Sequence, residues 1–171
     1  SLVLPSLLGQ AGVDVLTVNN RLDDAAPTET LAARRRDLQR LAELVASSRA
    51  AFGVRFDPVG ERISLVDEKG RLISDERALL VLLDLVAAER RGGRVALPVT
   101  TTRVAERVCR SYGVEVEWTA TSLDTLTRAA SHPDMIFAGD GRGGFIVPEF
   151  APTLDGLAVF LRLLGLVART R

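Results

Sequence analysis

The sequence predicts an α/β protein built of two small units, residues 1–74 and 75–171, in which mixed sheets are packed by helices in three layers. Several stretches carry apolar residues at helical spacing, and short alternating or continuous apolar stretches typical of strands lie between them. A helix cap at Ser74 or Asp75 marks the division between the units. The chain is long enough for such units to bury a proper core.

The composition is that of a globular protein, and it argues against two classes of partner. Hydrophobic residues make up 47% of the chain and charged residues 26%. The 22 basic and 22 acidic residues give a net charge of zero, so the chain has no excess field that would attract nucleic acid or an acidic membrane. We therefore expect neither nucleic acid nor a membrane as a partner.

The single cysteine, Cys109, excludes an intrachain disulfide and favours a reducing, cytoplasmic location. It falls in an expected helix, where a core position is a better interpretation than a nucleophile. The apolar runs are too short or too interrupted to span a bilayer, and we expect no signal peptide. The direct start in SLVLPSLLG indicates a fragment of a longer protein.

The first unit is expected to begin with a helix over Leu2–Gln10 and a strand over Val13–Val18. A polar loop then leads to a helix over about Leu31–Ser48, which Thr28 or Thr30 can cap. Apolar residues recur at helical spacing along one side of this helix, so we expect that face to be buried.

Three consecutive arginines, Arg34, Arg35 and Arg36, lie near the start of this helix. Such a run can form a patch that binds a phosphate or a partner, or it can be a solvated helix face. The solvated face is the usual position of surface charge. The sequence leaves both interpretations open.

The stretch 51–69 predicts a strand, a tight acidic turn and a second strand, because apolar residues line both flanks of the turn. Pro58 presets one backbone angle in the turn, and Gly60 allows a left-handed one. The turn can present Asp57 and Glu61 on one side. Two carboxylates on a rigid turn can hold a hard divalent cation.

The second unit is expected to alternate helices and strands. It begins with a helix over residues 75–91 that is apolar almost all round and is therefore expected to be buried. The further expected elements are a strand over Arg94–Pro98, a helix that opens at Thr100–Thr102 and runs to Tyr112, a strand over Val114–Trp118, a helix over Leu123–Ala130, strands over Met135–Ala138 and Phe145–Val147, and a helix over about Leu154–Ala168.

The acidic turn resembles the metal-binding loop of the phosphohexomutases, the phosphomannomutase and phosphoglucomutase superfamily. Their loop is an acidic D-G-D-G-D-R turn between two strands, and Val66–Arg71 is similar to the tail that follows it. Asp57 stands at the first ligand position, Val59 replaces the second aspartate, Glu61 replaces the third, and Arg62 matches. A valine side chain supplies no oxygen, so the resemblance implies a partial Mg²⁺ site on Asp57 and Glu61.

The glycine-rich segment Gly139–Gly144 occupies the position of a second phosphohexomutase loop, G-E-x-S-G-H, which hydrogen-bonds sugar hydroxyls. Asp140 replaces the glutamate, Arg142 the serine and Gly144 the histidine. The resemblance implies that Arg62, Asp140 and Arg142 are candidate substrate-binding residues. The alternative is a glycine-rich hairpin turn with Arg142 in solvent.

A third family loop carries a basic residue after the strand that corresponds to Val114–Trp118, but here Thr119–Asp124 contains neither Lys nor Arg. The resemblance covers essentially the whole chain. It implies that residues 1–74 correspond to the second phosphohexomutase domain, whose first strand would lie upstream of Ser1, and residues 75–171 to the third. Three functional loops are altered, while the strands and helices around them are kept.

These departures favour a degenerate phosphohexomutase-like module with a structural or regulatory role. Such modules resemble the C-terminal part of bacterial nucleotidyltransferases of the mannose-1-phosphate guanylyltransferase type, which act in sugar-nucleotide biosynthesis. The resemblance implies that the fragment itself is inactive, that its partner is the rest of its own chain, and that a sugar phosphate is the candidate ligand.

Two other interpretations stay open. The chain can be a fragment of an active Mg²⁺-dependent phosphomannomutase or phosphoglucomutase, which interconverts hexose 1- and 6-phosphates. The backbone carbonyl of Val59 would then join Asp57 and Glu61 around the ion, since Mg²⁺ keeps several waters in its shell. The remaining interpretation is a plain interaction domain without a ligand.

Overall fold

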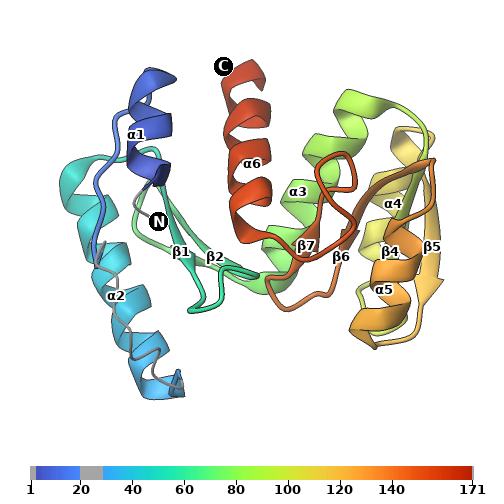
Figure 1. The fold of residues 1–171 in the computed structure, drawn as a ribbon, viewed down its shortest axis with the longest axis horizontal. Coiled ribbons are helices and arrows are strands. Elements are labelled where there is room, and N and C mark those ends of the chain that lie inside the picture. Colours follow the sequence, from blue (N-terminus) through green and yellow to red (C-terminus); the bar gives the residue numbers. More distant parts are fainter. Residues whose placement is uncertain (1–2, 20–28, 171) are drawn as a thin grey trace.

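The computed structural model describes residues 3–19 and 29–170, which form two sheets packed by helices (Figure 1). The predicted α/β class is confirmed. In chain order the elements are α1 (Val3–Gln10), α2 (Leu31–Ser48), β1 (Phe52–Phe56), β2 (Ile63–Asp67), β3 (Leu72–Ile73), α3 (Asp75–Arg90), β4 (Arg94–Pro98), α4 (Val104–Ser111), β5 (Glu115–Thr119), α5 (Leu123–Ala130), β6 (Met135–Gly139), β7 (Phe145–Ile146) and α6 (Gly156–Thr170).

The first sheet is antiparallel, with the order β1-β2-β3, and it lies between two helices. On one face, Gly53 lies so close to α2 that a Cβ atom there would stand 2.6 Å from Val45. On the other face, Phe52 and Phe56 contact the ring of Phe160 in α6 edge to face. Alternate residues of β1 thus pack on opposite helices, as the pleat of a strand requires.

The second sheet has the order β5-β4-β6-β7, in which β4 is parallel to both β5 and β6, and β7 is antiparallel to β6. Val95, Leu97 and Phe137 pack in one buried cluster with residues of α3 and α4. Ala96 and Ala138 belong to a separate buried cluster with α5. The two faces of this sheet are therefore covered by different helices.

Helix α6 returns across the molecule and contributes to a core that both sheets share. Its residues Val159, Leu163 and Leu166 lie in the same buried cluster as Ile63 of β2 and Leu79 of α3. Figure 1 shows α6 between the first sheet and α3. One hydrophobic core therefore extends through both sheets.

Two predicted helix caps are confirmed. The side chain of Thr30 accepts a hydrogen bond from the backbone N–H of Ala33 (3.1 Å), and that of Ser74 accepts one from Arg77 (3.3 Å). Each bond satisfies a backbone donor that has no partner within its helix. Thr28, the alternative cap for α2, lies outside the described residues. No helix among those described is both long and apolar enough to cross a membrane.

The predicted strand over Val13–Val18 is wrong. These residues are irregular and mostly exposed, and within residues 3–19 and 29–170 they pair with no strand. A strand needs a neighbour that donates and accepts its backbone hydrogen bonds, and an alternating sequence cannot supply one.

Two helices begin later than predicted. Helix α4 starts at Val104, so Thr100–Thr102 form a loop at the end of β4 instead of the first helical turn. Threonine suits a turn as well as a helix start, because its hydroxyl can bond to nearby backbone groups. Helix α6 starts at Gly156, because the carboxylate of Asp155 accepts the backbone N–H of Ala158 (2.9 Å) and caps the helix there.

Candidate functional site

Two loops that belong to different sheets meet beside α3. The acidic turn (residues 57–62) joins β1 to β2, and the glycine-rich loop (residues 140–144) joins β6 to β7. Arg62 and Gly144 form an isolated antiparallel bridge between them. The structure therefore brings together the two segments that the sequence singled out.

Their contact requires a glycine at position 143. The backbone N–H of Ile63 donates to the carbonyl oxygen of Gly143 (2.9 Å). The φ angle of Gly143 is +84°, and a Cβ atom at this position would lie 2.6 Å from the carbonyl oxygen of Ile63. Both the left-handed backbone and the close approach exclude a side chain without rearrangement.

Asp57 closes the acidic turn on itself. Its Oδ1 atom accepts the backbone N–H groups of Glu61 (2.8 Å) and Arg62 (3.1 Å). Its own backbone N–H donates to the carbonyl of Arg62 (3.0 Å), and its carbonyl accepts the N–H of Gly60 (3.1 Å). The side chain thus has a turn-forming role of the kind that aspartate often takes in loops.

The turn is also held from the side of α6. The backbone N–H of Gly156, the first residue of α6, donates to the carbonyl oxygen of Gly60 (2.8 Å). A Cβ atom on Gly156 would lie 2.8 Å from the same oxygen. Val59, at the tip of the turn, is 73% exposed. The backbone of the turn is therefore fixed, while its tip points to solvent.

These residues do not form a three-carboxylate metal site. Val59 offers no side-chain oxygen, and Oδ1 of Asp57 already accepts two backbone N–H groups. The Glu61 carboxylate lies 3.6 Å from the Arg62 guanidinium, which offsets its charge. Among the described residues, no group of three or more His, Cys, Asp or Glu side chains is placed to hold a metal ion. The described residues therefore lack the three-carboxylate donor set of the family's magnesium loop.

Asp140 is bonded within the protein through both carboxylate oxygens. Oδ1 accepts the backbone N–H groups of Arg142 (2.7 Å) and Gly144 (2.9 Å). Oδ2 accepts a hydrogen bond from Nη2 of Arg62 (3.0 Å). The Asp140 side chain is only 16% exposed. Two of the three predicted substrate-binding residues thus bind each other.

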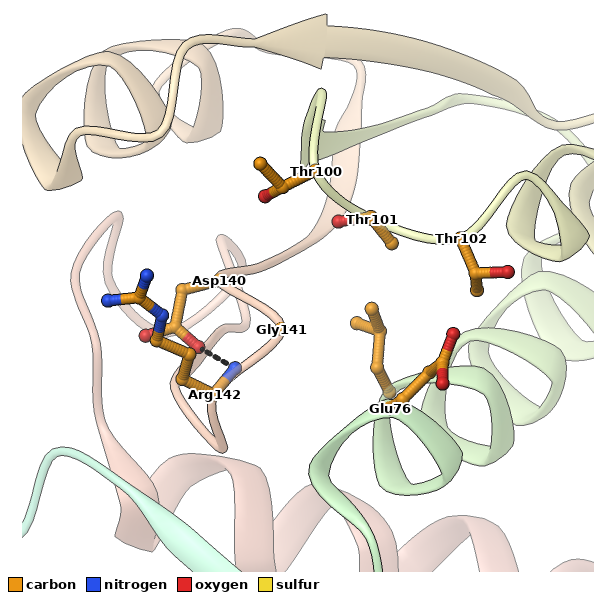
Figure 2. Close-up of a pocket in the computed structure, with 8 residues that line it drawn as sticks. Glu76, Thr100, Thr101, Thr102, Asp140, Gly141 and Arg142 are labelled. Carbon is orange, nitrogen blue, oxygen red and sulfur yellow. Dashed lines mark hydrogen bonds between the residues drawn. The ribbon is translucent and has the colours of Figure 1, made fainter.

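Arg142 contributes its backbone rather than its guanidinium to this arrangement. Figure 2 shows its N–H bonded to Asp140, with Thr100, Thr101 and Thr102 across from the glycine-rich loop. A cleft of about 260 Å³ lies between these threonines and the glycine-rich loop, with Glu76 and Leu79 of α3 as its floor.

The cleft lies at the carboxyl ends of β4 and β6. The chain continues from β4 to β5, which pairs with one edge of β4. It later returns to place β6 along the other edge of β4. The crevice at such a reversal of strand order is where open α/β sheets bind ligands. The topology therefore marks this cleft as the binding position, independently of the loop sequences.

Sequence reasoning missed the threonine loop, Thr100–Thr102, because it placed these residues in a helix. The hydroxyls of Thr101 and of Thr119, at the end of β5, are buried and have no hydrogen-bond partner among the described residues. Buried hydroxyls usually find one. Their position just after two neighbouring parallel strands was the signal that could have identified them.

Asp75 lies close to the glycine-rich loop, since a Cβ atom on Gly143 would be 3.6 Å from its Oδ1. Burial raises the pKa of the Asp75 carboxyl, the nearby Arg34 opposes the rise, and Asp140 adds to it. Burial at this position therefore disfavours the charged form of the Asp75 carboxyl.

The third altered loop, after β5, caps a helix. Ser122 accepts the backbone N–H of Thr125 (3.3 Å) at the start of α5. The hydroxyl of Thr125 in turn donates to the carbonyl oxygen of Ala120 (3.0 Å). These bonds give Ser122 and Thr125 a structural role at the start of α5.

Comparison with known proteins identifies the fold. Residues 74–171 match the family model described as phosphoglucomutase/phosphomannomutase, alpha/beta/alpha domain III. The chain belongs to the phosphoglucomutase/phosphomannomutase family. A solved phosphoglucomutase/phosphomannomutase family protein from Burkholderia thailandensis superposes with a TM-score of 0.82 at 24% identity, over 98% of this chain and 37% of that one. This likeness concerns the fold.

Similar sequences occur in mutases of the family. A phosphoglucomutase/phosphomannomutase from Thermococcus kodakarensis is 27% identical over 170 residues, which is 99% of this chain and 37% of that protein. A phosphoglucosamine mutase from Caulobacter vibrioides is 25% identical over 170 residues, which is 98% of this chain and 38% of that protein. The chain thus spans less than two fifths of the length of these relatives.

Proposed function

We propose that this chain is a non-catalytic module of the phosphoglucomutase/phosphomannomutase family, with a structural or regulatory role in a longer sugar-phosphate protein. The observation that carries the proposal is the hydrogen-bonded ion pair between Arg62 and Asp140. It joins the acidic turn to the glycine-rich loop. The charged groups of Arg62 and Asp140 are thereby bonded to each other instead of being open to a ligand.

The chemistry of phosphoryl transfer explains why this pairing matters. Such reactions depend on positioned charges, namely a metal ion and cations around the phosphoryl group, because electrostatic stabilisation supplies most of the rate. Here Asp57 and Asp140 accept four backbone N–H groups between them, and Arg62 bonds to Asp140. A metal or sugar would have to displace hydrogen bonds to charged carboxylates, each of which contributes about 1.5–3 kcal/mol.

For the parent protein we propose a nucleotidyltransferase of the mannose-1-phosphate guanylyltransferase type. What supports it is the pattern of change: three functional loops are altered, while the strands and helices that carry them are kept. The nucleotidyl transfer would take place outside these residues. The module would then position the rest of the parent chain or respond to its substrate.

One observation favours a second candidate, a fragment of an active Mg²⁺-dependent phosphomannomutase or phosphoglucomutase. In the described part of the chain, the hydrogen bonds to the Asp57 carboxylate use only Oδ1, and the Glu61 side chain is 45% exposed. Oδ2 of Asp57, Glu61 and the carbonyl of Val59 could then complete a magnesium shell together with a substrate phosphate.

An assay of the full-length parent protein separates the two candidates. We expect guanylyl transfer from GTP to mannose-1-phosphate and no interconversion of mannose 1- and 6-phosphates. We also expect that Asp140→Asn leaves guanylyl transfer within about twofold of wild type. Interconversion that requires Mg²⁺ and is lost in Asp140→Asn would instead establish the active mutase.

A further inference from the structure

A second concave surface shares no lining residue with the cleft. It has a volume of about 350 Å³ and lies between the start of α2, β3 and the start of α3. We call it the α2–β3 groove. Its apolar wall and cationic rim are formed by Leu31, Leu38, Leu72, Ile73, Arg34 and Arg35.

The apolar wall of the groove contains leucine side chains that are exposed to solvent instead of packed in the core. Leu31 is 76% exposed and Leu72 is 55% exposed, although both are large aliphatic residues. They lie on different elements, α2 and β3, and border the same groove. Because the removal of apolar surface from water is favourable, an apolar side chain bound in the groove would be stabilised there.

The rim carries net positive charge. Arg34 is held in place, since its Nη2 atom donates to the buried hydroxyl of Ser64 (3.3 Å) and lies 3.9 Å from the Asp75 carboxylate. That carboxylate offsets the charge of Arg34. Arg35 has no ion pair or side-chain hydrogen bond among the residues that the structure describes, and neither has Arg36 beside it. The charge of Arg35 is therefore available at the edge of the groove.

We propose that the α2–β3 groove binds an acidic peptide segment of a partner protein, with an apolar side chain between Leu31 and Leu72 and a carboxylate on Arg35. The guanidinium of arginine offers a planar fork of donors that matches a carboxylate. The volume is at the lower end of the range for ligand sites, about 300–1,000 Å³, and suits one or two side chains. Within the arginine run, Arg35 is thus a partner-binding residue rather than only part of a solvated face.

Fluorescence anisotropy with a short labelled peptide of alternating glutamate and leucine tests whether the α2–β3 groove binds an acidic segment. The protein should bind it saturably, and binding should weaken as NaCl is raised. Arg35→Glu should weaken binding about fivefold or more, and Leu72→Ser should also weaken it. Arg107→Glu, which reverses an exposed arginine on α4, is the matched control and should leave binding unchanged.

Each other outcome overturns the proposal. No saturable binding at millimolar protein, or equal loss in Arg35→Glu and Arg107→Glu, would show that the groove does not recognise the peptide. Equal binding of a peptide with serine in place of leucine would show attraction by charge alone. Groove-dependent binding to phosphatidylserine vesicles, but not to the peptide, would indicate a membrane surface instead. The groove lies apart from the cleft, so none of these results bears on the proposed non-catalytic role.

Discussion

Arg62 donates a hydrogen bond to Asp140 across 3.0 Å, although 78 residues separate them in the chain. Arg62 is the last residue of the acidic turn between β1 and β2, and Asp140 is the first residue of the glycine-rich loop after β6. Both loops face each other beside α3, and the pair closes the contact between them. The proposed loss of a metal and sugar site depends on this pair.

A double-mutant cycle measures the pair directly. We expect Arg62→Ala and Asp140→Asn to be coupled by about 0.5–1 kcal/mol in the free energy of unfolding by urea. The value is modest because the Arg62 side chain is 39% exposed, so solvent screens the charge. The asparagine keeps an oxygen that can accept the two backbone N–H groups at Asp140.

The exposed pair of Arg128 and Asp124 in α5 is the control for this cycle. Their side chains are 77% and 75% exposed, so their coupling should stay below about 0.5 kcal/mol. A coupling between Arg62 and Asp140 no larger than that of the control would mean that the two loops are not held together by this contact.

Gly143→Ala tests the close approach of the loops. The substitution should destabilise the protein by about 1–3 kcal/mol, because it forces a side chain onto a backbone with φ of +84° and brings a Cβ to 2.6 Å from a carbonyl oxygen. Gly165→Ala in α6, where no atom would lie within 4 Å of the new Cβ, should instead stabilise by about 0.5–1 kcal/mol. Thermal unfolding of both variants gives the comparison, and a neutral Gly143→Ala would refute the packing described.

The buried thiol of Cys109 should make the stability of the protein depend on pH. Burial raises the pKa of this thiol from 9.0 to about 11, so the folded state favours the neutral form. Between these two values the folded state binds more protons than the unfolded state, and stability therefore falls as the pH rises from about 9 to 11. Below pH 9 the contribution is fully present.

Urea unfolding of wild type and Cys109→Ser over this pH range isolates the effect. The variant should be less stable at neutral pH, because a hydroxyl replaces a buried thiol, but its stability should fall less steeply above pH 9. Iodoacetamide at neutral pH should label Cys109 only after unfolding. Rapid labelling of the folded protein would contradict the buried position.

Asp57 should act through its turn rather than through a metal. Asp57→Asn keeps an acceptor at Oδ1 and should lower the free energy of unfolding by less than about 1 kcal/mol. Asp57→Ala removes the acceptor of the N–H groups of Glu61 and Arg62 and should lower it by about 1–3 kcal/mol. Addition of Mg²⁺ should change the unfolding midpoint of Asp57→Asn by the same amount as that of wild type. A Mg²⁺-dependent stabilisation that Asp57→Asn removes would count against this role.

Local features were predictable because their causes lie within a few residues. The caps at Thr30 and Ser74 depend on bonds to backbone groups three residues away. The resemblance to phosphohexomutase loops also placed Asp57, Asp140 and their neighbours correctly between strands. Both kinds of signal can be recognised within a short continuous segment of the sequence.

Features that depend on distant partners were not predictable in the same way. The alternating stretch Val13–Val18 reads as a strand, but pairing needs a neighbouring strand. Thr100–Thr102 suit a helix start, yet they form a loop at the end of β4. The pairing of Arg62 with Asp140 arises from the arrangement of two sheets, for which no local pattern exists.

Calorimetric titration of the folded chain with Mg²⁺, and then with mannose-1-phosphate and glucose-1-phosphate, tests the central claim most directly. Because the carboxylates of both loops are bonded within the protein, we expect no saturable heat from Mg²⁺ and no effect of Mg²⁺ on sugar-phosphate binding. Saturable Mg²⁺ heat that tightens the binding of either sugar phosphate would contradict the non-catalytic module and support an active mutase fragment.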